Sequence, residues 1–169
     1  MKTAIRLAAG LAFALTLVAP QAALALDAPK GPVVLTITGA ISETNAPDAA
    51  EFDLEMLEAL AGRVTETETP WIDGKRRFEG PLGRAVLDAV GASGETLNVV
   101  ALNDYAAEIP VEDFRTLDVI LATRLDGKPM SVREKGPLFV IYPFDADSSL
   151  YNEKYFNRSV WQVARIEVH

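Results

Sequence analysis

The chain has 169 residues, of which 49% are hydrophobic and 24% are charged, and its formal net charge is −8. This balance is typical of one soluble globular domain with a sizeable core. There is no cysteine, and the single histidine is the last residue. These absences exclude disulfides, thiolate nucleophiles and zinc–thiolate sites, and they argue against a Ser-His-Asp triad or a histidine-rich metal centre.

The first 25 residues are typical of a secretory leader. Lys2 and Arg6 precede an apolar run from Leu7 to Val18, and Ala23–Ala25 is a small-x-small cleavage site. The apolar run is shorter than the roughly 20 residues needed to span a bilayer. We therefore expect a cleaved signal peptide over residues 1–25, a periplasmic or secreted protein, and no stable membrane insertion after cleavage.

Removal of this leader leaves one predicted domain over residues 26–169 and raises the net negative charge. The leader holds two basic residues and no acidic one, so the net charge changes from −8 to −10. Nucleic acids and anionic membrane surfaces both require a basic face. The charge therefore argues against both as partners, and solubility in the exported compartment is the simplest explanation of the acidity.

Residues 32–91 predict short strands and short helices. Pro32–Gly39 is a strand rich in Val, Ile and Thr. Asp53 suits the N-cap of a helix over Leu54–Leu60, which Gly62 ends. The other elements expected here are a loop over Ala40–Glu51, an exposed or edge strand over Arg63–Thr69, a strand over Lys75–Glu79 and a helix from Leu82 to Gly91.

Residues 96–169 add more strands and few helices, which favours an α+β fold with mixed sheets. Two strands, Thr96–Leu102 and Tyr105–Ile109, are joined by the tight polar turn Asn103-Asp104. The remaining elements expected are a helical turn over Pro110–Phe114, a polar loop over Phe144–Asn157 and a terminal strand over Ser159–His169, in which Trp161 is expected to lie in the core.

The segment from Asp118 to Pro143 is the centre of the predicted fold. Its two apolar runs, Val119–Ala122 and Leu138–Tyr142, do not alternate with polar residues, so each is expected to be a strand buried on both faces. Turn signals and a cluster of basic residues lie between them. The segment therefore predicts a buried strand pair with a basic loop at its edge.

Four stretches of the chain, in this order, resemble the molybdopterin-binding domain of the sulfite oxidase type. They are Phe78–Gly91, Asn103–Pro110, Asp118–Pro143 and Trp161–Val168. The corresponding family features are an aromatic-x-Gly helix, a D-G-Y-like turn, an N-G-x-P-L loop with a G-P-L-R strand, and a W-x-x-x-I-x-V strand. The resemblance covers most of the chain from about Thr65 onward. It implies an α+β fold of mixed sheets and short helices, with molybdopterin as the cofactor of the family.

The chain departs from this family where the metal is bound. Family enzymes hold molybdenum through a cysteine thiolate on the strand and loop before the aromatic-x-Gly helix, and here Val64–Trp71 contains no cysteine. Thr and Glu oxygens are hard donors and poor substitutes for a thiolate. Glu134-Lys135 stands where the family often has a histidine, and the dimerisation domain of the larger enzymes has no counterpart. We therefore expect no cofactor, and molybdopterin is implied by the resemblance alone.

The basic residues around the central loop form one candidate site. Arg124, Arg133 and Lys135 are the core of this set, and Arg76, Arg77, Arg84 and Lys128 are candidates for the same edge. Arginine forks match phosphate or carboxylate, and the resemblance implies a pterin phosphate nearby. Surface ion pairing with acidic neighbours such as Glu134 is the simpler explanation.

Two further candidates are polar or aromatic. Asn103, Asp104 and Tyr105 occupy the turn that approaches the cofactor in the family, although Asn-Asp is also an ordinary turn dipeptide. Trp71 would lie at the entrance of the family's cofactor pocket and could stack on a flat or cationic ligand. Glu66 and Glu68 share a strand face and could bind a hard cation, but two carboxylates alone make a weak ligand set, and solubility of an exposed edge is the simpler explanation.

Three functions remain open at this point. The favoured one is a non-catalytic periplasmic binding or sensing module, with a small anionic or pterin-like ligand and a periplasmic or membrane-protein partner. The second is a genuine molybdopterin-dependent oxidoreductase that binds its cofactor without a thiolate. The third is a structural or interaction domain whose pocket is filled by side chains.

Overall fold

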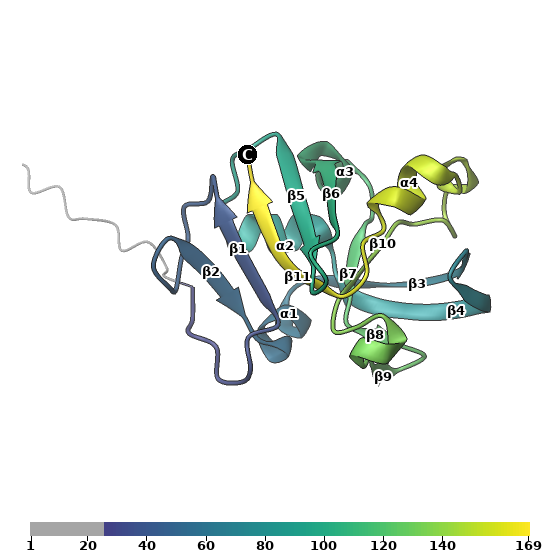
Figure 1. The fold of residues 1–169 in the computed structure, drawn as a ribbon, viewed down its shortest axis with the longest axis horizontal. Coiled ribbons are helices and arrows are strands. Elements are labelled where there is room, and N and C mark those ends of the chain that lie inside the picture. The colour runs from purple at the N-terminus through teal and green to yellow at the C-terminus, as the bar shows by residue number, and fades with distance from the viewer. Residues whose placement is uncertain (1–25) are drawn as a thin grey trace, which may run out of the picture.

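The computed structural model describes residues 26–169, and Figure 1 shows their arrangement. The predicted leader, residues 1–25, lies outside the described residues. The described part is an α+β fold with three sheets and short helices, as expected from the sequence. None of its helices is both long and apolar enough to span a bilayer.

The largest sheet has five strands in the order β2-β1-β11-β5-β6. Strand β1 runs parallel to β11, and the other neighbours are antiparallel, so the sheet is mixed. Strand β11, near the C-terminus, therefore lies between β1 and β5 and joins the N-terminal strands to the rest of the sheet. The strands are β1 (Leu35–Gly39), β2 (Ala49–Phe52), β5 (Thr96–Ala101), β6 (Ala106–Pro110) and β11 (Val163–Val168).

The two central apolar runs form an antiparallel pair, β7 (Ile120–Ala122) with β10 (Phe139–Ile141). All six residues of these strands are buried. Successive residues of β7 face two different hydrophobic clusters, with Leu121 in the larger one and Ile120 in the smaller. The prediction of strands buried on both faces is therefore confirmed.

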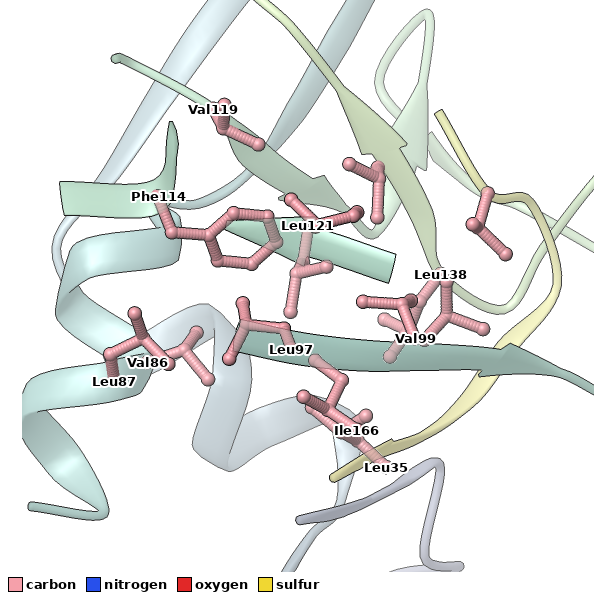
Figure 2. Packing of buried hydrophobic residues seen from close by; sticks show 14 of the residues in the cluster. Leu35, Val86, Leu87, Leu97, Val99, Phe114, Val119, Leu121, Leu138 and Ile166 are labelled. Atoms are coloured by element: carbon pink, nitrogen blue, oxygen red, sulfur yellow. The ribbon is translucent and has the colours of Figure 1, made fainter. Parts of the chain in front are cut away.

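The larger cluster, called the main core here, lies between the five-stranded sheet, the helices and one face of the β7–β10 pair. Figure 2 shows Phe114 and Leu121 directed toward the β5 side chains Leu97 and Val99. The helices are α1 (Leu54–Ala59), α2 (Gly83–Ala89) and α3 (Val111–Thr116). Helix α1 begins at Asp53 as predicted, because the Asp53 carboxylate accepts the Met56 backbone N–H at 2.9 Å.

The third sheet has the order β3-β4-β8-β9 and extends away from the five-stranded sheet as a long hairpin (Figure 1). Its strands are β3 (Gly62–Thr69), β4 (Ile72–Pro81), β8 (Arg124–Leu125) and β9 (Lys128–Pro129). Strand β4 packs closely on β7 at Gly80, where a side-chain Cβ would come within 2.1 Å of the Leu121 carbonyl oxygen. Only glycine allows these two backbones to approach so closely.

The smaller cluster, called the second cluster here, fills the space between this hairpin and the outer face of the β7–β10 pair. Its buried members are Phe78, Ile120, Ala122, Met130, Phe139 and Ile141, and both tryptophans pack against it. The second cluster therefore has both tryptophans at its rim, whereas the main core is mainly aliphatic.

Two segments predicted as loops contain regular elements. The expected loop over Ala40–Glu51 contains the start of β2, whose Ala-rich sequence lacks a strand pattern and which forms because it pairs with β1. The expected loop over Phe144–Asn157 contains a 3₁₀ turn (Ser148–Leu150) and most of α4 (Glu153–Arg158). The first helix ends at Ala59 with Leu60 as its C-cap, close to the expected end, and Gly62 already belongs to β3.

Candidate functional site

Three segments that are far apart in the chain line one cavity of about 230 Å³. Trp71 comes from the two-residue turn between β3 and β4, and Asn103 and Tyr105 come from the turn between β5 and β6. The remaining wall is supplied by α4 and by the residues that lead into β11. The full lining is Trp71, Ala101, Asn103, Tyr105, Phe156, Asn157, Ser159 and Trp161. The sequence contains two tryptophans, and both lie here.

Trp71 is the centre of the aromatic wall. Its ring lies edge-on to three others, with centroid distances of 5.8 Å to Phe156, 5.6 Å to Trp161 and 5.5 Å to Phe139. Edge-to-face packing of this kind fixes ring orientation and adds about 0.5–1.5 kcal/mol per pair beyond burial. Trp71 is therefore held by contacts from the second cluster and from α4, and only part of its surface remains for a ligand. Trp161 is half-buried at the rim rather than in the core as expected.

The turn between β5 and β6 is held by its own polar groups. Asp104 has a positive φ of 62°, and the Asn103 side-chain oxygen accepts the Tyr105 backbone N–H at 3.2 Å. The Tyr105 hydroxyl donates to the Asn157 carbonyl at 3.2 Å, which ties the turn to α4 across the cavity. The Asp104 carboxylate instead pairs with Arg165 at 3.1 Å and does not line the cavity.

Helix α4 is fixed against α3 by a compact polar network. The Asp113 carboxylate oxygen Oδ2 accepts the Tyr142 hydroxyl and an Arg158 guanidinium N–H, each at 2.7 Å. Burial, together with the hydrogen bond to Asp113, raises the pKa of the Tyr142 hydroxyl well above its usual range. Tyr142 therefore stays a neutral donor, and this network positions the wall formed by Phe156 and Asn157.

The basic residues of the predicted anion site do not gather at this cavity. Arg124 makes a two-pronged ion pair with Glu58, at 2.8 and 2.9 Å, and its hydrogen bonds hold the pKa of the Glu58 carboxyl below its usual range. Arg133 is exposed. Only Lys135 reaches the aromatic wall, since its ammonium lies 4.4 Å from the centroid of the Trp161 ring.

Arg124 lines a second, larger cavity of about 380 Å³ beside α1 and the start of β3. Its charged lining residues are Glu58, Arg63, Glu79 and Arg124. Most of these charges are already paired, because Glu79 bonds to Arg77 and Arg63 bonds to Asp145. The second cavity is therefore polar but largely compensated within the protein.

One face of β3 carries polar atoms that are buried without a partner. Thr65 and Thr69 are at most 7% exposed, and neither hydroxyl has a hydrogen bond within the described residues. The third such atom is Nη1 of Arg63, which lies on the same strand. An unpaired buried polar group costs about 1–3 kcal/mol. The strand that leads to Trp71 is therefore less well satisfied than the rest of the described fold.

Strand β3 and its turn supply hard oxygen donors and no thiolate. The inward side chains of β3 are threonines, and Glu66 and Glu68 are exposed. Within residues 26–169, no cluster of three or more acidic or histidine side chains could hold a metal ion.

The sequence interpretation identified Trp71, Asn103 and Tyr105 but missed the wall that faces them. Phe156, Asn157 and Ser159 were assigned to a loop or strand without a role. Asn152 was an available signal, because it is an N-cap residue whose side chain accepts the Lys154 backbone N–H at 3.0 Å. The apolar pair Tyr155-Phe156 that follows indicates the packed face of α4.

Comparisons with known proteins identify no family for this chain. A scan against protein-family models gave no match for the chain, and a search of curated proteins likewise gave none. The class defined by the structure is an α+β domain with a small, aromatic-walled cavity.

Proposed function

We propose that this protein is a non-catalytic binding or sensing module, exported to the periplasm, with a molybdopterin-binding-domain-type fold of the sulfite oxidase kind. Its ligand is a small flat ring compound, anionic or pterin-like, bound in the aromatic-walled cavity. The observation that carries the proposal is the convergence of both tryptophans with Asn103 and Tyr105 on one cavity. The chain supplies no thiolate, so the proposal includes no redox step.

The cavity matches this ligand class in size and in chemistry. Half-buried indole faces suit stacking on a flat ring, and the amide of Asn103 can hydrogen-bond a heterocycle edge. The Lys135 ammonium beside Trp161 supplies a positive charge near the rim. Arg124 and Arg133 lie elsewhere and take no part, so binding depends on the aromatic wall more than on charge.

The two tryptophans provide a direct measurement. We expect pterin-6-carboxylate to quench the intrinsic tryptophan fluorescence of the purified mature protein and to raise its melting temperature. Trp71→Leu should weaken this binding about tenfold or more, since stacking on an aromatic ring is worth about 1–3 kcal/mol. Arg124→Gln is the matched control, because it alters the second cavity and leaves the aromatic one intact.

The charge contribution is tested with a neutral analogue. Lys135→Gln should weaken pterin-6-carboxylate and leave 6-hydroxymethylpterin unchanged. If no flat ring compound in either charge state quenches the fluorescence or shifts the melting temperature, the binding proposal fails and an interaction domain is favoured. If the protein purifies from its own periplasm with equimolar molybdenum and pterin, the oxidoreductase alternative replaces it.

A further inference from the structure

Strand β3 offers an unpaired backbone edge as well as its buried face. It is eight residues long and lies at the end of its sheet, bonded only to β4. The ladder bond from the Leu82 N–H to the Ala61 carbonyl, at 2.9 Å, continues the register that pairs Thr65 with Phe78. In this register, which holds from Gly62 to Thr67, the odd-numbered residues bond to β4, and the even-numbered ones direct their N–H and C=O groups away from it.

The outward backbone groups are accessible and without partners. Val64, Glu66 and Glu68 are exposed, and within residues 26–169 no backbone bond from outside the β3–β4 ladder reaches their N–H groups. Within the described part of the chain, the only side-chain hydrogen bond to an outward carbonyl is that of the Thr67 hydroxyl to Glu68. The alternate side chains Thr65, Thr67 and Thr69 are buried, so the strand is held in place against the rest of the fold. A preformed, unpaired edge of this length is the structure that accepts an added strand.

The charges on this edge select the occupant. Neither Glu66 nor Glu68 has an ion-pair partner within the described residues, and Arg77, the cross-strand neighbour of Glu66, bonds to Glu79 instead. A second copy of β3 would bring four carboxylates onto one short ribbon, and like charges on neighbouring strands are destabilising. An extended segment with basic side chains at alternate positions would neutralise them instead.

We propose that β3 docks an extended basic segment of a partner protein by strand addition. Antiparallel pairing places a basic residue opposite Glu68, a second basic residue opposite Glu66 and an apolar residue opposite Val64. The partner motif is therefore basic-x-basic-x-apolar, because alternate side chains of a strand share one face. This inference stands on the edge of the hairpin and does not depend on the aromatic cavity.

The test uses a fluorescein-labelled peptide, Ser-Lys-Thr-Lys-Thr-Val-Ser with blocked ends, and the full mature protein. We expect a rise in anisotropy that weakens at high salt. A peptide of the same composition with its two lysines adjacent should bind about tenfold more weakly, because adjacent side chains point to opposite faces. Glu66→Lys should also reduce binding about tenfold, since it replaces an attraction with a repulsion.

Two further variants separate strand addition from general charge attraction. Glu66→Pro removes an outward N–H and leaves the bonds to β4 in place, so the protein should fold and lose the peptide. Glu108→Lys makes the same charge change on an exposed residue of β6, an edge strand of the five-stranded sheet, and should not alter peptide binding. Equal binding of both peptides, or an equal loss from Glu108→Lys, would overturn the proposal. Sedimentation that shows a dimer broken by Glu66→Lys would do so too, because the occupant would then be a second copy.

Discussion

The two faces of the β7–β10 pair pack against surroundings of different quality. On one face, Leu121 and Val140 lie in the main core, which is aliphatic and enclosed by helices and the five-stranded sheet. On the other, Ile120 and Ile141 lie in the second cluster, where half-buried tryptophans and a cavity interrupt the packing. The main core provides a rigid platform, and the second cluster retains the space and exposed aromatic surface that binding requires.

The distribution of unpaired polar atoms shows the same contrast. Within residues 26–169, the three buried side-chain atoms without a hydrogen bond all belong to β3, which borders the second cluster. The main-core side contains Tyr142, whose buried hydroxyl is bonded to Asp113. The buried polar atoms without hydrogen bonds therefore lie on the strand that leads to the candidate site and not in the main core. Ligand-binding regions are often less stable than the scaffold that holds them.

The largest effect should come from truncating the main core. Leu121→Ala should lower the free energy of unfolding by about 3 kcal/mol or more, because the residue is fully buried among packed side chains that cannot collapse around the cavity. Ile141→Ala removes a similar volume from the second cluster and should cost about 2 kcal/mol, since the half-buried rings at its rim can shift. Urea unfolding measures both.

A surface truncation calibrates this pair. Val64→Ala, on the exposed face of β3, should change the free energy of unfolding by less than about 0.5 kcal/mol. Should Ile141→Ala prove costlier than Leu121→Ala, the second cluster would be the tighter of the two, and the contrast between them would be lost.

An intermediate effect, of opposite sign, is expected on the buried face of β3. Thr65→Val replaces an unpaired buried hydroxyl with a methyl group and should stabilise the protein by about 1 kcal/mol. Thr67→Val is the matched control, because the Thr67 hydroxyl donates to the Glu68 carbonyl at 3.1 Å and its loss should be neutral or destabilising. Thermal unfolding of the two variants distinguishes these outcomes. Stabilisation by both substitutions, or by neither, would show that the missing hydrogen bond of the Thr65 hydroxyl does not destabilise the protein.

Local patterns predicted the elements that carry their own signals. The apolar runs at β7 and β10, the Asn103-Asp104 turn and the Asp53 cap were recognised because each depends on a few neighbouring residues. Strand β2 and helix α4 were missed, because pairing with β1 and aromatic packing override weak propensity.

The candidate site was harder to predict than the fold. Trp71 and Asn103 were each singled out from the sequence, but their meeting depends on how the hairpin tip packs against the turn between β5 and β6. Arg124 was grouped with Lys135 because they are near in sequence, yet their side chains bond to different elements, α1 and the region before β11. Charge clustering along the chain does not specify which acidic partner lies closest in space.

The smallest effect concerns the ion pair that Arg124 makes with Glu58. Glu58→Gln should lower the free energy of unfolding at pH 7 by about 0.2–1 kcal/mol, because the Glu58–Arg124 pair is partly exposed and screened. The pKa of Glu58 is lowered in the folded protein, mainly by its hydrogen bond to Arg124, so its stabilisation is present at neutral pH and is lost as the pH falls through the folded-state pKa. Chemical unfolding should therefore give the wild type a higher free energy of unfolding than the variant at pH 7. At pH 3 the two proteins should have the same free energy of unfolding. A difference that persists at pH 3 would assign the stabilisation to packing of the Glu58 side chain rather than to its charge.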